Sequence, residues 1–142
     1  MTNPQHSVSV AAVITDDQNR ILVIQRRDNG QWQIPGGILE RDESIHDGVR
    51  REVNEETRLT VEPERLTGVY KNVKVGVVAL VFKAHVTAGE PGPTEESAAV
   101  DWWTVDRVTA EMNETFAVRV TDALRGHDTA VRIHDGVTLI AG

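Results

Sequence analysis

A short acidic segment constrains this chain more than any other feature. Residues 50–59 read RREVNEETRL, and they lie at the end of residues 42–57, whose pattern predicts a helix. Its three glutamates, Glu52, Glu55 and Glu56, have i, i+3 and i+4 spacing, which places them on one helix face. Like charges at this spacing repel by roughly 0.2–0.5 kcal/mol per pair on an exposed helix. The segment therefore needs a compensating positive charge.

The apolar residues of the same helix show where two of the glutamates point. At roughly 100° per residue, Glu52 and Glu56 fall on the side of Val49 and Val53. They also crowd the last turns, where the helix dipole disfavours anions. A helix that breaks local rules on one face is a functional candidate. A hard divalent cation such as Mg²⁺, which prefers carboxylate and carbonyl oxygens, resolves the conflict. A solvated acidic face without a ligand is the alternative.

Composition limits the other possibilities. The chain has 142 residues, a size typical of one domain, and an apolar fraction of 39% that suffices for a core. It has no apolar run long enough for a transmembrane helix, and its first residues do not resemble a signal peptide. The absence of cysteine excludes disulfides and thiolate metal sites and is consistent with a cytoplasmic protein. A net charge of −7 argues against broad nucleic-acid binding.

Hydrophobic periodicity and turn residues predict a mixed β-sheet packed by helices. The expected strands are residues 7–14, 20–27, 60–72 with a break at Glu62-Pro63, 74–85 and 99–103, with a short extended piece at 31–37. Helices are expected at 42–57, capped by Asp42 or Ser44, and at 105–111 and 114–125. Residues 88–97 are expected to form a loop, and residues 130–140 a hairpin around Asp135-Gly136.

The glutamates belong to a longer motif of 23 residues. Gly37 is followed by five residues and Glu43, then by seven residues and the run REVNEETRL. This pattern resembles the Nudix box, G-x5-E-x7-R-E-U-x-E-E-x-G-U, in which U is aliphatic. The preceding WQIPGG also resembles the lead-in of that family. The one specified position that differs is Arg58, where the family has glycine, which puts the geometry of the helix exit in question.

The resemblance implies a single Nudix hydrolase domain over residues 1–142, with an α/β/α sandwich around a mixed sheet. It implies Mg²⁺, or Mn²⁺, held by three motif carboxylates and a backbone carbonyl. By position these ligands are Glu52, Glu55, Glu56 and the carbonyl of Gly37. Glu52 and Glu55 are the catalytic candidates, with Glu52 the first choice for the water-activating base. The remaining motif residues, Glu43 and Arg51, are expected to pair and to hold the preceding loop against the helix.

Further candidates lie outside the motif. Glu96, next to Glu95, resembles a loop carboxylate that many Nudix enzymes use as another metal ligand, and a solvated loop is the alternative. Arg26 and Arg27 are expected to contact phosphate unless they are simply exposed. Asn113 resembles a base-recognising asparagine, and a helix N-cap is the alternative.

Several aromatic and polar side chains are weaker candidates. Trp32 is expected in the core rather than in a stacking platform. Tyr70, Lys71 and Asn72 are possible pocket residues that no motif supports.

The resulting expectation is a Mg²⁺-dependent pyrophosphohydrolase of a nucleoside diphosphate linked to a group X. Nucleoside triphosphates, including damaged ones, are the leading substrate class. ADP-ribose, a nucleoside diphosphate sugar or a dinucleoside polyphosphate is the runner-up. A non-catalytic nucleotide-binding regulator and an acidic interaction domain are the alternatives from other classes. A homodimer through the C-terminal hairpin is also expected.

Overall fold

The computed structural model describes residues 3–141. The strands are β1 Ser7–Ile14, β2 Ile21–Arg26, β3 Trp32–Gln33, β4 Gly36–Ile38, β5 Thr60–Asn72, β6 Val77–Ala88, β7 Ser97–Trp103, β8 Ala130–His134 and β9 Leu139–Ile140. The helices are α1 Ile45–Thr57, α2 Val105–Glu111 and α3 Glu114–Arg125. Within this part of the chain, no helix is long and apolar enough to cross a membrane.

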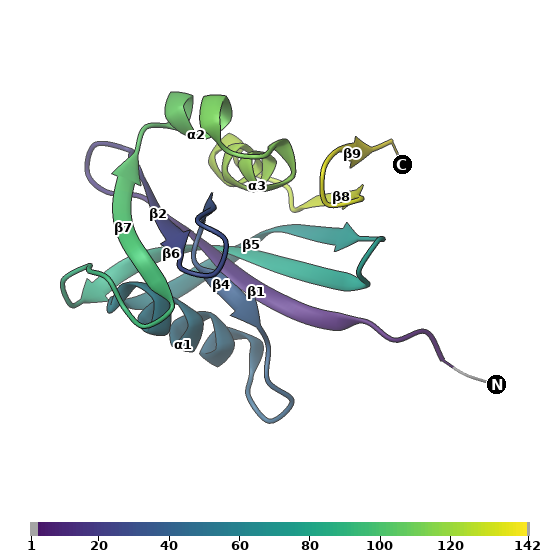
Figure 1. Cartoon of the computed structure of the whole chain (residues 1–142), viewed down its shortest axis with the longest axis horizontal. Coiled ribbons are helices and arrows are strands. Elements are labelled where there is room, and N and C mark those ends of the chain that lie inside the picture. The colour runs from purple at the N-terminus through teal and green to yellow at the C-terminus, as the bar shows by residue number, and fades with distance from the viewer. Residues whose placement is uncertain (1–2, 142) are drawn as a thin grey trace.

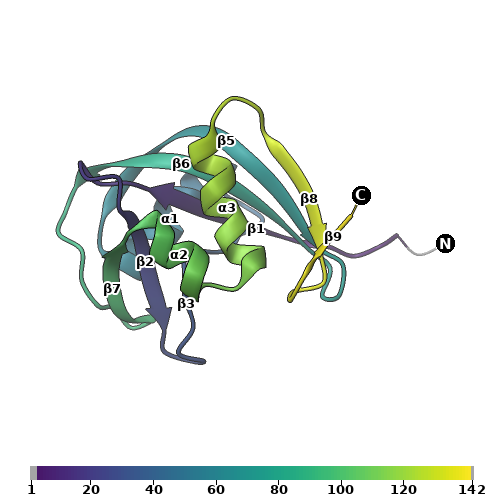
Figure 2. The ribbon, with the colours of Figure 1, turned by 90° about the horizontal axis from the view of Figure 1, so that it is seen from above.

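The strands form two sheets. The larger has the order β4-β1-β6-β5-β8-β9 and is mixed, because β1 pairs with β6 and β5 with β8 in parallel. The smaller has the order β3-β2-β7 and is antiparallel. Helix α1 lies on one side of the strands, and α2 and α3 lie on the other (Figures 1 and 2). This confirms the expected mixed sheet with helices on both sides.

Strand β1 lies between β4 and β6, and its residues 10–14 are buried on both faces. Its alternating side chains contribute to two apolar clusters. Ala11 and Val13 pack toward α2 and α3, whereas Val10, Ala12 and Ile14 pack toward α1 with Val49 and Val53. Since α1 is fixed by this second cluster, its glutamate face is held rigidly beside the sheet.

Several boundaries differ from those that the sequence predicts. Helix α1 begins at Ile45 rather than residue 42, because the Ser44 side chain caps it by accepting a hydrogen bond from the N–H of Asp47 at 3.1 Å. Strand β5 continues through Pro63 with register shifts instead of a break. Strand β6 begins at Val77 because the β5–β6 connection turns at Gly76, whose φ is +69°.

The segment before α1 divides between the two sheets. Strand β3 joins the small sheet and β4 joins the edge of the large one, with Ile34 and Pro35 between them. A Cβ on Gly36 would clash with the backbone carbonyl of Val10, so glycine permits this close approach of β4 to β1. The approach brings the glycine pair next to α1.

Candidate functional site

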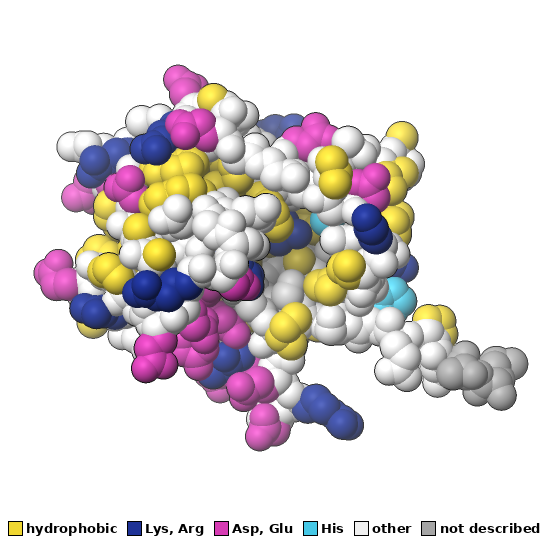
Figure 3. All heavy atoms as spheres, in the orientation of Figure 1, with side chains coloured by type: hydrophobic (Ala, Val, Ile, Leu, Met, Phe, Trp, Pro, Cys, Tyr) yellow, Lys and Arg dark blue, Asp and Glu magenta, His cyan; other side chains and the backbone are white. Residues whose placement is uncertain are grey.

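Three carboxylates from two segments meet beside the end of α1. Glu52 and Glu55 come from the helix, and Glu96 comes from the loop before β7. One carboxylate oxygen from each of the three glutamates lies within 4.8 Å of the corresponding oxygens of the other two. Figure 3 shows the acidic side chains that gather on the α1 side of this face. The structure therefore brings together the loop glutamate and two of the motif glutamates that the sequence singles out.

The glycine pair lies directly against the remaining motif carboxylates. The backbone N–H of Gly36 donates a 2.6 Å hydrogen bond to the carboxylate of Glu56. A Cβ on Gly37 would clash with the Glu52 carboxylate, so the backbone of Gly37 touches this side chain. Both glutamates are buried, as the helical wheel predicts.

Burial changes the proton affinity of these two glutamates. It raises the pKa of Glu56 to about 8, with Glu52 and Glu96 adding repulsion and the Gly36 hydrogen bond opposing the shift. Burial also raises the pKa of Glu52, against the opposing effect of Arg51. Both shifts have the sign expected for carboxylates that are desolvated next to other carboxylates.

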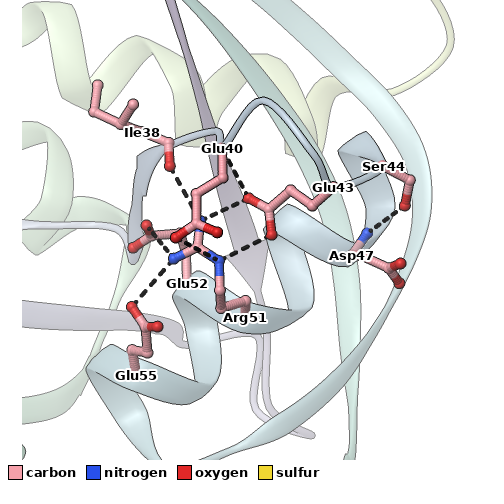
Figure 4. A network of polar contacts seen from close by, with 8 residues as sticks. All are labelled: Ile38, Glu40, Glu43, Ser44, Asp47, Arg51, Glu52 and Glu55. Atoms are coloured by element: carbon pink, nitrogen blue, oxygen red, sulfur yellow. Dashed lines mark hydrogen bonds and ion pairs between the residues drawn. The ribbon is translucent and has the colours of Figure 1, made fainter.

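The Arg51 guanidinium lies among the acidic side chains and bonds to several of them (Figure 4). Its guanidinium donates to Glu43 at 2.9 and 2.7 Å, to Glu52 at 2.9 Å and to Glu55 at 3.2 Å. It also donates to the carbonyl of Ile38 at 3.1 Å, just after β4. The expected Glu43–Arg51 pair is therefore present, and it joins the loop to the helix.

The helix exit keeps the geometry that normally favours glycine. Arg58 has φ 70° and ψ 0°, and its N–H donates to the carbonyl of Asn54 at 2.9 Å. The loop that carries Glu96 packs on this exit, because the N–H of Gly92 donates to the carbonyl of Thr57 at 3.1 Å. The arginine thus adopts the left-handed turn instead of remaking it.

Two arginines face the acidic cluster across a cleft of about 510 Å³. Arg27 donates to the carbonyl of Thr94 at 2.9 Å, which ties it to the Glu96 loop. Arg26 pairs with Asp28 at 2.8 Å. The cleft is lined by Arg26, Arg27, Asp28, Gly36, Gly37, Ile38, Glu52, Glu56, Glu95 and Glu96. Cationic and anionic groups therefore line the same space.

A second cavity of about 410 Å³ adjoins the first and lies between the large sheet and α3. The two spaces share Arg26, Gly36, Gly37 and Ile38. Tyr70 and Asn72 line the second cavity, whereas Lys71 is exposed and does not. Such a cavity, largely apolar with a few polar groups, has the character of a small-molecule site.

Asn113 lies elsewhere. It caps α3, because its side chain accepts hydrogen bonds from the N–H and hydroxyl of Thr115 at 2.8 and 2.9 Å. It lines a separate hollow beside Trp32 and Trp103 rather than the cavity next to the glutamates. The structure thus favours the N-cap alternative for Asn113. Trp32 packs against the core, with its ring centroid 5.0 Å from that of Trp103.

Three buried ionisable residues near α3, Arg119, Asp122 and His134, were not among the sequence candidates. Arg119 and His134 line the second cavity, and Asp122 lies behind it. Asp122 accepts hydrogen bonds from Tyr70 at 2.8 Å and from Arg132 at 2.7 Å. An arginine three residues after Phe116 on the apolar face of an amphipathic helix is the signal that points to Arg119.

The donor set of the cluster suits a hard cation. It consists of carboxylate oxygens, and the candidate metal group contains neither histidine nor cysteine. Magnesium and manganese prefer such oxygen ligands, and their charge offsets the repulsion between clustered carboxylates. The residues therefore fit a divalent metal.

Comparison with known proteins identifies the family. Residues 5–124 match the model of the NUDIX domain. A MutT-like protein of Streptomyces ambofaciens is 51% identical over 96% of this chain and 89% of its own. An ADP-ribose pyrophosphatase of Methanocaldococcus jannaschii is 36% identical over 59% of this chain and 53% of its own. The crystal structure of a MutT protein from Methanosarcina mazei superposes with a TM-score of 0.74, at 27% identity, covering 88% of this chain and 97% of that one. The chain belongs to the NUDIX domain family and is a Nudix hydrolase, an enzyme that acts on phosphoanhydride bonds.

Proposed function

We propose that this enzyme is a Mg²⁺-dependent pyrophosphohydrolase whose leading substrates are nucleoside triphosphates, including those with damaged bases. The observation that carries the proposal is the convergence of Glu52, Glu55 and Glu96 at a cleft that Glu52 and Glu96 line together with two arginines. Clustered carboxylates and phosphate oxygens together form the environment that Mg²⁺ takes in phosphoryl-transfer sites.

The motif residues take distinct roles in this proposal. Glu52, Glu55 and Glu96 hold the cation, with Glu56 and the carbonyl of Gly37 completing the donor set. When bound, the cation acidifies water and offsets the negative charge of the phosphates. Glu52 is the first choice for the base, because it is buried in the cluster and burial raises its pKa, which makes the carboxylate a stronger proton acceptor. Glu55 is the second.

The arginines bind the substrate in this proposal. Arg26 lines both the acidic cleft and the adjoining cavity, so it is suited to a phosphate group at their junction. Arg27 is fixed to the Glu96 loop and is suited to a more distal phosphate. Guanidinium groups bind phosphate oxygens with charge-assisted hydrogen bonds, which positions the phosphoanhydride for attack by water.

Two other functions remain as candidates. ADP-ribose, a nucleoside diphosphate sugar or a dinucleoside polyphosphate is the alternative substrate, and the similarity to an ADP-ribose pyrophosphatase favours it. A non-catalytic nucleotide-binding role is the alternative from another class. The presence of every motif glutamate argues against that role, because a purely binding domain does not need them all.

A substrate panel with product identification tests the proposal. Nucleoside triphosphates, ADP-ribose, diphosphate sugars and dinucleoside polyphosphates are incubated with enzyme, with Mg²⁺ or with chelator. We expect metal-dependent release of a monophosphate and pyrophosphate from triphosphates. Preferred cleavage of ADP-ribose supports the alternative substrate, and binding without turnover supports the non-catalytic role.

Two neighbouring loop glutamates form a matched pair for the metal assignment. Glu96 belongs to the carboxylate cluster, whereas Glu95 lines the cleft outside it. We expect Glu96→Gln to raise the Mg²⁺ concentration needed for half-maximal activity by about tenfold or more, and Glu95→Gln to raise it much less. Equal effects of the two substitutions would contradict the assignment of Glu96.

The expected homodimer stays a prediction. Strand β9 is at the edge of the large sheet, so its outer hydrogen-bonding groups are suited to pair with a second chain. Light scattering coupled to size-exclusion chromatography measures the mass directly.

A further inference from the structure

The cavity beside α3 has a polarity opposite to that of the acidic cleft. Arg26, Arg119 and His134 line it, and none of its lining residues within the described chain is acidic. Its walls are otherwise largely apolar, with Ile34, Val77, Ala79 and Phe116 among them. Figure 3 shows the face hollowed between α3 and the strands. Any ligand in this cavity meets apolar walls and a small number of hydrogen-bond donors.

Arg119 is buried there without a charged partner. It is 9% exposed, and it takes part in none of the ion pairs or hydrogen bonds found among residues 3–141. Its guanidinium carbon lies 5.1 Å from the ring centroids of both Tyr70 and Phe116, and its buried Nε has no hydrogen-bond partner in that part of the chain. Burial lowers the pKa of Arg119 to about 10, which still leaves it charged at neutral pH.

The acidic residue on the next turn of α3 does not compensate this charge. Asp122, one turn along α3, already accepts hydrogen bonds from Tyr70, Arg125 and Arg132. A buried cation without a partner is costly in free energy. We therefore expect the buried guanidinium of Arg119, which lines the cavity, to bind a ligand there.

His134 offers a second unpaired donor to the same cavity. It is 2% exposed, and its Nδ1 accepts a hydrogen bond from the N–H of Gly136 at 2.9 Å. The neutral ring must therefore carry its proton on Nε2. Burial lowers the pKa of His134, with Arg119 adding to the effect, so the neutral ring dominates near pH 7. The buried Nε2 lacks a partner within the described residues.

The two nitrogens without a partner, Nε of Arg119 and Nε2 of His134, both carry hydrogen, so a ligand that bonds to them must present acceptors. Among the nucleobases, guanine presents O6 and N7 as adjacent acceptors, an edge that arginine binds well, and uracil presents O4. Adenine and cytosine carry an amino group, which is a donor, at the corresponding positions. We propose that Arg119 and His134 are specificity-determining residues that select nucleotides with a carbonyl oxygen at purine C6 or pyrimidine C4. This inference rests on the proposed function, which places the phosphates in the adjoining acidic cleft.

Nucleotide affinity without turnover tests the inference. Dissociation constants of GMP, IMP, UMP, AMP and CMP are measured by NMR titration in the presence of chelator. IMP and AMP are the sharpest pair, because the change from carbonyl to amino group at C6 is the main difference between their bases. We expect the oxo nucleotides to bind on the order of tenfold more tightly than the amino nucleotides.

A matched pair of variants assigns this preference to Arg119. Arg119→Met removes the donors and keeps an extended side chain, whereas Arg125→Met makes the same change on the exposed side of α3. We expect Arg119→Met to lose the preference and Arg125→Met to keep it. Because Arg119 is buried without a partner, Arg119→Met is also expected to melt no lower than the wild type. Kinetic constants for GTP and ATP with Mg²⁺ should show the same loss, mainly in KM.

Three results would overturn the inference. They are equal affinities of the wild type for IMP and AMP, tighter binding of AMP, and an unchanged preference in Arg119→Met. The first two depend on the wild type alone, so they decide the question even if the variant does not fold. An enzyme that prefers IMP to AMP but hydrolyses no nucleotide would support base selection and contradict the proposed hydrolysis.

Discussion

Arg51 and Glu43 are joined by two hydrogen bonds, of 2.9 and 2.7 Å, across the loop that leads into α1. The pair adjoins the acidic cluster, since the same guanidinium also donates hydrogen bonds to Glu52 and Glu55. Arg51 holds the pKa of Glu43 down at about 2, so the pair is fully charged at neutral pH. Arg51 therefore supplies positive charge to Glu43, Glu52 and Glu55 at the same time.

Replacing Arg51 by lysine tests this positioning role. Lysine keeps the charge but cannot make the forked contact with Glu43 while also reaching the other two carboxylates. We expect Arg51→Lys to lower metal affinity or kcat by roughly 10–100-fold, in the range seen when groups that orient metal ligands are removed. Isothermal titration with Mn²⁺ and steady-state kinetics measure the two quantities.

Arg50→Lys is the matched control for that change. Arg50 makes its ion pairs with Asp47 and Glu62 on the other side of α1. The Arg50→Lys variant should retain the metal affinity and turnover of the wild type within about twofold, since exposed ion pairs contribute little to stability. Equal losses in Arg50→Lys and Arg51→Lys would show that Arg51 has no special role.

The buried Glu56 predicts an unusual pH dependence for the metal-free protein. Its pKa is about 8 in the folded state and near 4.5 as a model value, so between these pH values the folded state holds a proton that the unfolded state has lost. The contribution of Glu56 to the free energy of unfolding must therefore decrease as pH rises from 4.5 to 8. In Glu56→Gln the free energy of unfolding should fall less between pH 4.5 and 8, so the variant gains stability relative to the wild type at pH 8.

Urea denaturation in chelator at pH 5, 6.5 and 8 measures that slope. Glu90→Gln, in the exposed loop after β6, serves as the control and should follow the wild type. If Glu56→Gln and the wild type lose stability equally between pH 5 and 8, the raised pKa of Glu56 is wrong.

The left-handed backbone conformation of Arg58 costs free energy, and glycine at this position would lower that cost. A non-glycine residue in this conformation is less stable by about 1–2 kcal/mol, and the larger backbone entropy loss of glycine offsets part of the gain. We expect Arg58→Gly to stabilise the protein by up to about 1 kcal/mol, which corresponds to a Tm increase of roughly 2–4 °C. Arg58→Ala keeps the Cβ and should give no such gain, as differential scanning calorimetry of both variants would show. A lower Tm for glycine than for alanine would contradict this explanation.

Local sequence patterns account for much of the site. The burial of Glu52 and Glu56 follows from their phase relative to Val49 and Val53 on the helix. Capping preferences limit the N-cap to Asp42 or Ser44, and the structure has Ser44. These two features depend on residues within about one turn of each other, so a single sequence goes far toward predicting them. The sequence leaves the left-handed conformation of Arg58 open, because an arginine at this position can also remake the turn.

Features that depend on distant contacts were harder to predict. The unpaired state of Arg119 depends on Asp122 being occupied by Tyr70 and Arg132, which come from other elements. The donor state of His134 depends on the turn at Gly136. The division of residues 31–38 between two sheets likewise depends on pairing with β1 and β2, which no local pattern determines.

The most direct test of metal-dependent hydrolysis at the carboxylate cluster is to measure turnover of the best nucleotide substrate as a function of Mg²⁺ concentration. The wild type, Glu55→Gln and Glu90→Gln are compared. Glu55 belongs to the carboxylate cluster, and Glu90 is exposed outside it. We expect that chelator abolishes turnover, that Glu55→Gln lowers kcat on the order of a hundredfold or more, and that Glu90→Gln behaves like the wild type. Turnover that persists in chelator, or a Glu55→Gln enzyme as active as Glu90→Gln, would contradict metal-dependent hydrolysis at this cluster.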